Sequence, residues 1–356
     1  MKKILSLLLA ALLTVGSLTA CNGSSPADDG KLRIVTTIFP EYDWVMNILG
    51  DNPADAEVTM LLDTGVDLHS FQPTADDILK ISTADMFIYV GGESDEWVEK
   101  ALAQAKNKNL VAINLLEVLG DAVKEEEIVE GMQADHDHDH DHEDDDHDHE
   151  DGDDHDHEDA DHEDEDHDHD HDHEDDEKEY DEHVWLSLRN ASALVKHIAK
   201  ALGKIDSDHA EVYTANASAY TDKLKALDAE YQKAVDGSTV RTLLFGDRFP
   251  FRYLTEDYGL SYYAAFVGCS AESEASFETI TFLSKKVDEL GLPVVLTIEG
   301  TNHKIAETVV RSTQNGDQMI LALDSMQSVT AKDVKDGANY LAIMEKNLEV
   351  LKEALK

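Results

Sequence analysis

The sequence predicts an α/β fold made of two four-stranded lobes that one long helix joins. Strand-like and helix-like segments alternate from Lys31 to the middle of the chain and again towards its end. Such alternation is typical of parallel sheets with helices on their faces. Between the two series lies a helical pattern of about 28 residues, long enough at about 1.5 Å per residue to run along both lobes.

The first series contains four expected strands with three expected helices between them. Each strand is a short apolar run, and each helix has apolar residues at helical spacing. The strands cover residues 32–38, 56–62, 85–90 and 110–115, and the helices cover residues 41–49, 74–82 and 94–105.

The long helix is expected over residues 207–235, after a shorter helix over residues 189–202, with Asp206 or Ser207 as its N-cap. Its apolar and aromatic residues alternate in steps of four and three: Tyr213, Ala217, Tyr220, Leu224, Leu227 and Tyr231. The second series has strands over residues 242–245, 261–266, 293–298 and 318–323 and helices over residues 251–258, 277–290 and 304–312. A last helix covers residues 340–355.

The N-terminus has the pattern of a secretory signal. Two lysines precede an apolar stretch that is too short for a convincing membrane span. Leu18-Thr19-Ala20-Cys21 resembles the bacterial lipobox, which would make Cys21 the lipid-bearing first residue of the mature chain. We therefore expect a signal peptide (1–20), a lipid-anchored linker (21–30), an N-terminal lobe (31–134, completed by 178–205), an intervening run (135–177), a linking helix (206–236) and a C-terminal lobe (237–356).

The intervening run contains only His, Asp and Glu, apart from Gly152 and Ala160. Without apolar residues it cannot offset the entropy of ordering itself, so we expect a solvated loop. Imidazole and carboxylate groups at this density suit zinc and similar divalent ions, whereas a merely solubilising tract would not need the histidines. The expected loop ligands are His136, His138, His140, His142, His147, His149, His155, His157, His162, His167, His169, His171 and His173.

The charge of the chain indicates a cation as its ligand. The formal net charge is −48, and without the 28 acids of the run it is still about −20. This argues against nucleic acid or an anionic membrane surface as the partner. The sequence has two cysteines, Cys21 and Cys269, so acylation of Cys21 leaves no intramolecular disulfide.

Two Asp-x-His triplets stand outside the run, at Asp67-Leu68-His69 and Asp181-Glu182-His183. Neutral imidazole binds zinc well, and a nearby carboxylate can orient the ring. The first triplet follows an expected strand, and ligands of open α/β sheets bind beyond the carboxyl ends of strands. The two triplets therefore predict a metal site built on His69 and His183.

Both triplets lie in longer motifs. Gly65-Val66-Asp67-Leu68-His69-Ser70-Phe71-Gln72-Pro73 resembles the G-x-D-P-H-x-[YF]-x-P motif of the metal-specific solute-binding proteins of zinc and manganese ABC transporters. Asp181-Glu182-His183-Val184-Trp185-Leu186 resembles their second motif, D-P-H-x-W-L, which many zinc-specific members precede with a His- and acid-rich loop. The similarity extends from Lys31 to Lys356. It implies a C-clamp fold with the metal held in the cleft between two α/β lobes.

The resemblance implies a ligand set with one gap. His69 and His183 match the first two family ligands, but the third, His or Glu, falls on Gly246. Asp247 is the nearest replacement, although it could equally be a helix N-cap. Asp324 matches an acidic fourth ligand, and Glu299 matches an acid at the end of the preceding strand.

The remaining His and Cys residues have plainer interpretations. His197 and His209 lie on expected helices and are interpreted as surface residues, whereas His303 could reach the cleft. Cys269 follows an expected strand and is either a buried apolar thiol or a soft ligand that replaces the missing one. The three tryptophans are interpreted as core or inter-lobe packing.

These features predict an extracytoplasmic, lipid-anchored, monomeric protein, not an enzyme, that captures Zn²⁺ and delivers it to an ABC permease in the membrane. Two histidines favour zinc over magnesium or calcium, while Mn²⁺ remains an alternative because the third imidazole is missing. A second class is a His-rich zinc buffer or metallochaperone without a transporter. A third, a zinc hydrolase, is disfavoured because no His-Glu-x-x-His motif places a general base beside the ligands.

Overall fold

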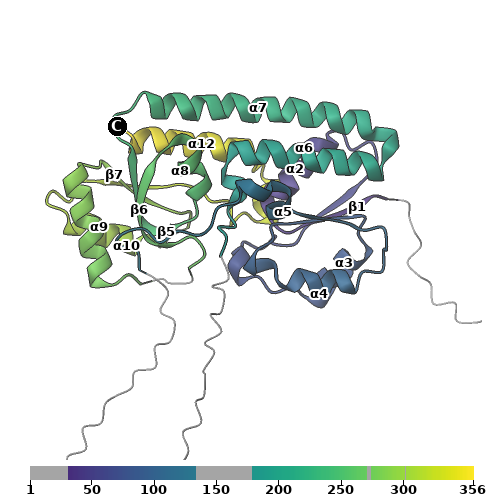
Figure 1. Ribbon diagram of the computed structural model, residues 1–356, viewed down its shortest axis with the longest axis horizontal. Helices are drawn as coiled ribbons and strands as arrows, with labels where there is room; N and C mark the ends of the chain where they lie inside the picture. The colour runs from purple at the N-terminus through teal and green to yellow at the C-terminus, as the bar shows by residue number, and fades with distance from the viewer. Residues whose placement is uncertain (1–30, 134–178, 271–273, 301) are drawn as a thin grey trace, which may run out of the picture.

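The computed structural model describes residues 31–133, 179–270, 274–300 and 302–356. Two α/β lobes lie side by side, and helix α7 (Ala210–Asp236) runs along both of them (Figure 1). The predicted fold class is therefore confirmed. The expected signal peptide, linker and His-rich run lie outside the described residues. Among the helices that the structure describes, none is both long and apolar enough to cross a membrane.

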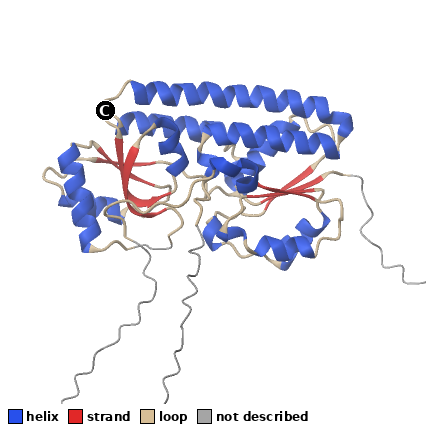
Figure 2. Cartoon of the chain, in the orientation of Figure 1, coloured by secondary structure: helices blue, strands red, loops and turns tan. Residues whose placement is uncertain are grey.

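The N-terminal lobe is built on a four-stranded parallel sheet in the order β2-β1-β3-β4. Figure 2 shows strands of this lobe in red, with helices above and below them in the view. Ile34 at its centre is fully buried and pairs with Val58 on one side and Met86 on the other. The strands are β1 (Arg33–Thr36), β2 (Glu57–Met60), β3 (Met86–Tyr89) and β4 (Val111–Asn114). The helices are α2 (Phe39–Leu49), α3 (Ala75–Thr83), α4 (Trp97–Ala103) and α5 (Leu115–Leu119).

The C-terminal lobe repeats this architecture with the strand order β6-β5-β7-β8, again all parallel. The strands are β5 (Thr242–Phe249), β6 (Ser261–Val267), β7 (Val294–Thr297) and β8 (Met319–Ala322). The helices are α8 (Arg252–Tyr258), α9 (Phe277–Leu290), α10 (Lys304–Ser312), α11 (Ala331–Lys335) and α12 (Tyr340–Ala354). Strand β5 extends past its expected end because a register shift against β6 carries it through Asp247 and Arg248.

Helix α6 (Leu188–Ile205) packs along α7, and together they cover one side of the molecule (Figure 1). The predicted apolar stripe of α7 is buried throughout, from Tyr213 to Tyr231. The helix begins at Ala210, later than expected, because Ser207–His209 form a separate 3-10 turn. The Asp206 carboxylate accepts a 2.6 Å hydrogen bond from the Tyr213 hydroxyl and so ties this turn to the helix.

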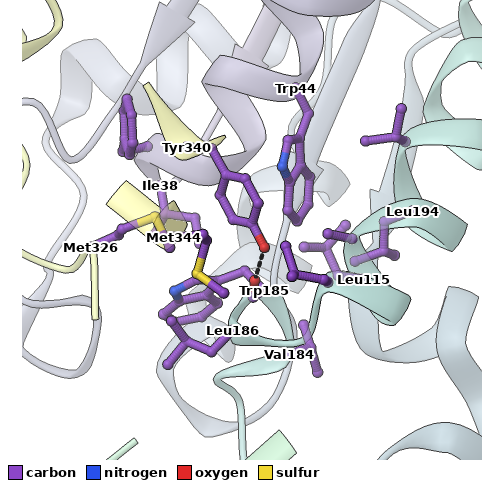
Figure 3. Close-up of a cluster of buried hydrophobic side chains, with 14 of the residues drawn as sticks. Ile38, Trp44, Leu115, Val184, Trp185, Leu186, Leu194, Met326, Tyr340 and Met344 are labelled. Atoms are coloured by element: carbon purple, nitrogen blue, oxygen red, sulfur yellow. Dashed lines mark hydrogen bonds between the residues drawn. The ribbon is translucent and has the colours of Figure 1, made fainter. Parts of the chain in front are cut away.

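A buried aromatic cluster connects three distant parts of the chain (Figure 3). The Tyr340 hydroxyl donates a 2.6 Å hydrogen bond to the Trp185 carbonyl, and the Trp185 indole donates a 2.8 Å bond to the Ser325 carbonyl. The Trp44 ring packs edge-on against Tyr340, with centroids 5.5 Å apart. Trp44 and Trp185 are fully buried, as predicted, and Trp185 fixes the segment that carries His183.

Candidate metal centre

His69 lies in a 3-10 turn, Leu68–Ser70, in the loop that follows β2. The Asp67 carboxylate caps this turn by accepting a 3.1 Å hydrogen bond from the His69 backbone N–H. Leu68 is buried in the core of the N-terminal lobe, which anchors the turn. Gly65, at φ +79°, starts the loop, and an added Cβ there would lie 3.0 Å from the Ser328 carbonyl oxygen. The local sequence therefore fixes His69 at the carboxyl edge of the sheet.

His183 is completely buried just before the 3-10 turn Val184–Leu186. The Asp181 carboxylate accepts a 2.9 Å hydrogen bond from its backbone N–H and lies 3.2 Å from the ring Nδ1. The second Asp-x-His triplet thus holds its histidine as the first one does, through a carboxylate two residues earlier. In this triplet the carboxylate also contacts the imidazole Nδ1.

The two imidazoles face each other, with their Nε2 atoms 3.2 Å apart. A tetrahedral zinc ion with Zn–N bonds of about 2.0–2.1 Å would hold two ligand nitrogens about 3.3 Å apart. Both Nδ1 atoms are directed to other groups: Asp181 for His183, and the Ser94 hydroxyl at 2.8 Å for His69. Each ring therefore presents Nε2 to the same point, with its other nitrogen held by the protein.

Burial and the neighbouring His183 lower the pKa of His69 to about 3. Burial alone would lower the pKa of His183 as well, but the adjacent Asp181 carboxylate raises it above its ordinary value. Burial therefore favours the neutral form of His69. A neutral imidazole is the form that binds a metal ion.

Cys269 brings a third potential ligand from the opposite lobe. The ligand atoms of His69, His183 and Cys269 all lie within 4.8 Å of one another. Cys269 follows β6 and is a free, half-buried thiol. Burial, and then the nearby carboxylate of Glu126, raises the pKa of this thiol. Among the residues described, these three side chains form the one group of three or more that could hold a single metal ion.

The three predicted carboxylate ligands lie outside this group and bind backbone amides instead. Asp247 belongs to β5, so it is no helix N-cap, and it accepts a 3.3 Å hydrogen bond from Ile298 N–H. Glu299 accepts bonds of 2.7 and 2.8 Å from the Ser325 backbone and hydroxyl. Asp324 accepts a 2.8 Å bond from Met326 N–H, and burial together with Glu299 raises its pKa to about 6.

Gly246, which the resemblance predicts to stand at the third ligand position, has no room for a side chain. A Cβ atom there would lie 2.5 Å from the Cα of Ala306, because α10 packs directly on this part of β5. His197 is exposed on α6, as predicted. His209 lies 2.7 Å from the Asp206 carboxylate in the turn before α7. His303 precedes α10 and is half-buried, outside the group of three described above.

Arg248 is a site residue that sequence reasoning missed. Its guanidinium donates to Asp67 across the lobes at 2.7 Å and to the Ser270 carbonyl at 3.3 Å. Ser94 and Glu182 were also missed, and both lie beside His69 Nδ1, with Glu182 Oε2 at 3.5 Å. Glu182 stands next to His183 in the second motif, where the related pattern has proline, and this departure was the available signal.

An acidic cavity of about 370 Å³ opens beside the two histidines, with His69 and Cys269 in its wall. Five glutamates line it: Glu93, Glu96, Glu126, Glu179 and Glu182. Such a concentration of negative charge attracts cations. Glu126 N–H donates to the Glu179 carbonyl at 2.9 Å, so the chain segments before and after the His-rich run meet at this cavity. The thirteen histidines of the run and Cys21 lie outside the described residues.

Two α/β lobes with paired imidazoles and an acidic cavity between them define a two-lobed metal-binding protein. The chain belongs to the ZnuA family, described as "Zinc-uptake complex component A periplasmic", whose model matches residues 34–354. It is 32% identical to the zinc-binding lipoprotein AdcA of Streptococcus pneumoniae serotype 4 over 99% of this chain, and it spans 61% of that relative's length. It is 27% identical to the high-affinity zinc uptake system protein ZnuA of Bacillus subtilis over 95% of this chain and 92% of that protein.

Solved structures agree with this assignment. The Zn(II)-bound ZnuA-like domain of Streptococcus pneumoniae AdcA superposes with a TM-score of 0.64 at 27% identity, covering 92% of this chain and 99% of that one. The metal-dependent lipoprotein YcdH of Bacillus subtilis, at 24% identity and a TM-score of 0.67 over 91% of this chain and 99% of that one, shares the fold.

Proposed function

We propose that this protein captures Zn²⁺ between its lobes with His69 and His183 and delivers it to an ABC permease in the membrane. The observation that carries the proposal is the pair of facing Nε2 atoms, 3.2 Å apart, on rings whose Nδ1 atoms other side chains hold. Imidazole ligands favour zinc over the oxygen-preferring ions magnesium and calcium. Its relatives named for zinc binding and zinc uptake support the same metal.

The protein acts outside the cytoplasm as a carrier, without catalysing a reaction. The signal segment, the expected lipid on Cys21 and the lipoprotein name of its relative support an anchored location. We propose a monomer, because the site needs residues of one chain only. The His-rich run would then collect zinc with low affinity at the cavity, where the two segments that flank it meet.

Zinc-limited growth of cells that lack this protein tests the function. We expect the intact chain and the exposed-surface variant Asp222→Asn to restore growth, because Asp222 lies on α7, outside the site. The double variant His69→Ala/His183→Ala should fail, although it is exported in equal amount. Restored growth with the double variant would contradict the proposed role of the cleft.

A further inference from the structure

We propose that Cys269 supplies the third metal ligand as a thiolate from the C-terminal lobe. The site would then hold its ion with two imidazoles from one lobe and one sulfur from the other. This inference rests on the proposed function, since it assigns a further ligand to the same ion. It also names the class of ion: thiophilic divalent cations such as Zn²⁺ and Cd²⁺, with Mn²⁺ disfavoured.

The geometry is close to that of a tetrahedral zinc site. With Zn–S at about 2.3 Å and Zn–N at about 2.05 Å, each ligand nitrogen lies about 3.6 Å from the sulfur. The Cys269 sulfur already lies within 4.8 Å of a ligand nitrogen on both His69 and His183. The sulfur therefore needs to move by about 1.2 Å or less to satisfy each of these distances.

The C-terminal lobe can offer a donor from the loop after β6 but none from position 246 of β5. A side chain at Gly246 would collide with the backbone of α10, so β5 cannot present a ligand from there. The neighbouring strand β6 ends at Val267 and is followed by Gly268 and Cys269. A Cβ at Gly268 would lie 2.9 Å from His183 Cε1, so the glycine allows the backbone to pass directly against this imidazole. The close approach brings Cys269 to the site.

Contacts from both lobes hold the loop that carries Cys269. The Cys269 backbone N–H donates to the Glu126 carboxylate at 3.4 Å. The carbonyl of Ser270 accepts a 3.3 Å bond from Arg248, and the same guanidinium binds Asp67, two residues before His69. Arg248 therefore links the turn of one ligand to the loop of the other. This linkage is what a site assembled between two lobes requires.

A second observation points to an ion at this point. Glu182 is buried, and among the described residues its Oε2 accepts no hydrogen bond although it lies 3.5 Å from His69 Nδ1. Buried carboxylate oxygens are rarely left without a donor. An ion on His69 Nε2 fixes the ring proton at Nδ1, where it faces Ser94 and Glu182. The oxygen is therefore placed to orient a metal-bound His69.

Cobalt spectroscopy tests the proposal directly. The probe is Co²⁺, added to the full chain carrying Cys21→Ser, so that Cys269 is the sole thiol. A thiolate ligand produces an intense near-ultraviolet charge-transfer band that imidazole and carboxylate ligands do not. We expect this band to saturate at one Co²⁺ per protein and to vanish in Cys269→Ala. The exposed-histidine variant His197→Ala should keep the band at full intensity.

Two other outcomes would each overturn this proposal, but they differ in whether the proposed function survives. Visible tetrahedral bands that disappear in His69→Ala/His183→Ala, without the charge-transfer band, would show a cleft site that lacks sulfur. The proposed function would survive that result. If Co²⁺ and Zn²⁺ titrations of the Cys21→Ser chain are unchanged by the histidine substitutions, the proposed function falls as well.

A second measurement uses the Cys21→Ser chain, which retains Cys269. It therefore does not depend on whether the Cys269→Ala variant folds. One equivalent of Zn²⁺, but not of Mn²⁺, should slow alkylation of Cys269 at least tenfold in the Cys21→Ser chain. Equal alkylation rates with and without Zn²⁺ would contradict ligation. Cys269→Ala should weaken Zn²⁺ affinity by more than the roughly 10- to 100-fold that loss of an outer-shell partner costs.

Discussion

Arg248 of the C-terminal lobe and Asp67 of the N-terminal lobe form a 2.7 Å ion pair across the site, and both side chains are largely buried. Asp67 also caps the turn that carries His69, so the pair links the C-terminal lobe to the position of this proposed ligand. Burial would raise the pKa of Asp67, but the Arg248 guanidinium and the His69 backbone N–H hold it below its ordinary value. This ion pair therefore connects the two lobes beside the proposed metal ligands.

The first prediction concerns this ion pair. A double-mutant cycle of Asp67→Asn and Arg248→Ala should give a coupling free energy of about 1–3 kcal/mol in unfolding, because the charged hydrogen bond is shielded from water. The measurement is chemical denaturation of the four proteins. The matched control is Lys332–Asp336, an exposed pair at 2.6 Å, for which we expect about 0.5 kcal/mol or less. Equal coupling in both pairs would refute the shielding argument.

The second prediction concerns the orientation of His183. Asp181→Asn should weaken zinc binding by about 10- to 100-fold, because the carboxylate orients the imidazole and strengthens it as a ligand. Competitive zinc titration measures the effect. The control, Asp222→Asn, changes an exposed acid on α7 and should leave affinity unchanged. Unaltered zinc affinity in Asp181→Asn would contradict the orienting role of the Asp181 carboxylate.

The third prediction is a pH dependence of stability at Asp43. Burial raises the pKa of Asp43 to about 6, although the Tyr220 hydroxyl donates to it at 3.1 Å. The unfolded value is about 3.9, so the folded state binds this proton more tightly. Its contribution to stability is complete below about pH 4 and is lost as the pH rises through 6.

Asp43→Asn, which does not titrate, should therefore gain stability relative to the natural chain as the pH rises. The expected gain between pH 4 and pH 8 is about 2–3 kcal/mol. Thermal unfolding at a series of pH values measures it, and Asp222→Asn serves as the exposed control. A stability difference between Asp43→Asn and the natural chain that does not change with pH would contradict the raised pKa of Asp43.

The fourth prediction concerns the crowded position on β5. Gly246→Ala should lower the free energy of unfolding by about 1–3 kcal/mol, because its Cβ would lie 2.5 Å from the Cα of Ala306. Gly237→Ala, whose nearest neighbour is the Lys233 carbonyl oxygen at 3.3 Å, should change it by about 1 kcal/mol or less. Equal effects at both positions would show that α10 can move away.

Strands and long helices were predictable because their apolar periodicity is strong, as the buried stripe of α7 shows. The helices α5 and α11 were missed because five residues give too little pattern, and β5 was ended early because Asp247 and Arg248 are polar. The close placement of His69 and His183 was predictable from the two sequence motifs that contain them. The sequence left Cys269 open between a buried thiol and a soft ligand, because its approach to the histidines depends on the packing of one lobe on the other and on the space left by Gly268.

The most direct test of the central claim is competitive zinc titration of the chain without residues 135–177, with and without His69→Ala/His183→Ala. Removing the run leaves the cleft as the expected binding site, so the account predicts one tight site that the double substitution abolishes. The intact chain should show the same tight site together with weaker ones. Tight binding that disappears with the run and survives the double substitution would contradict the account.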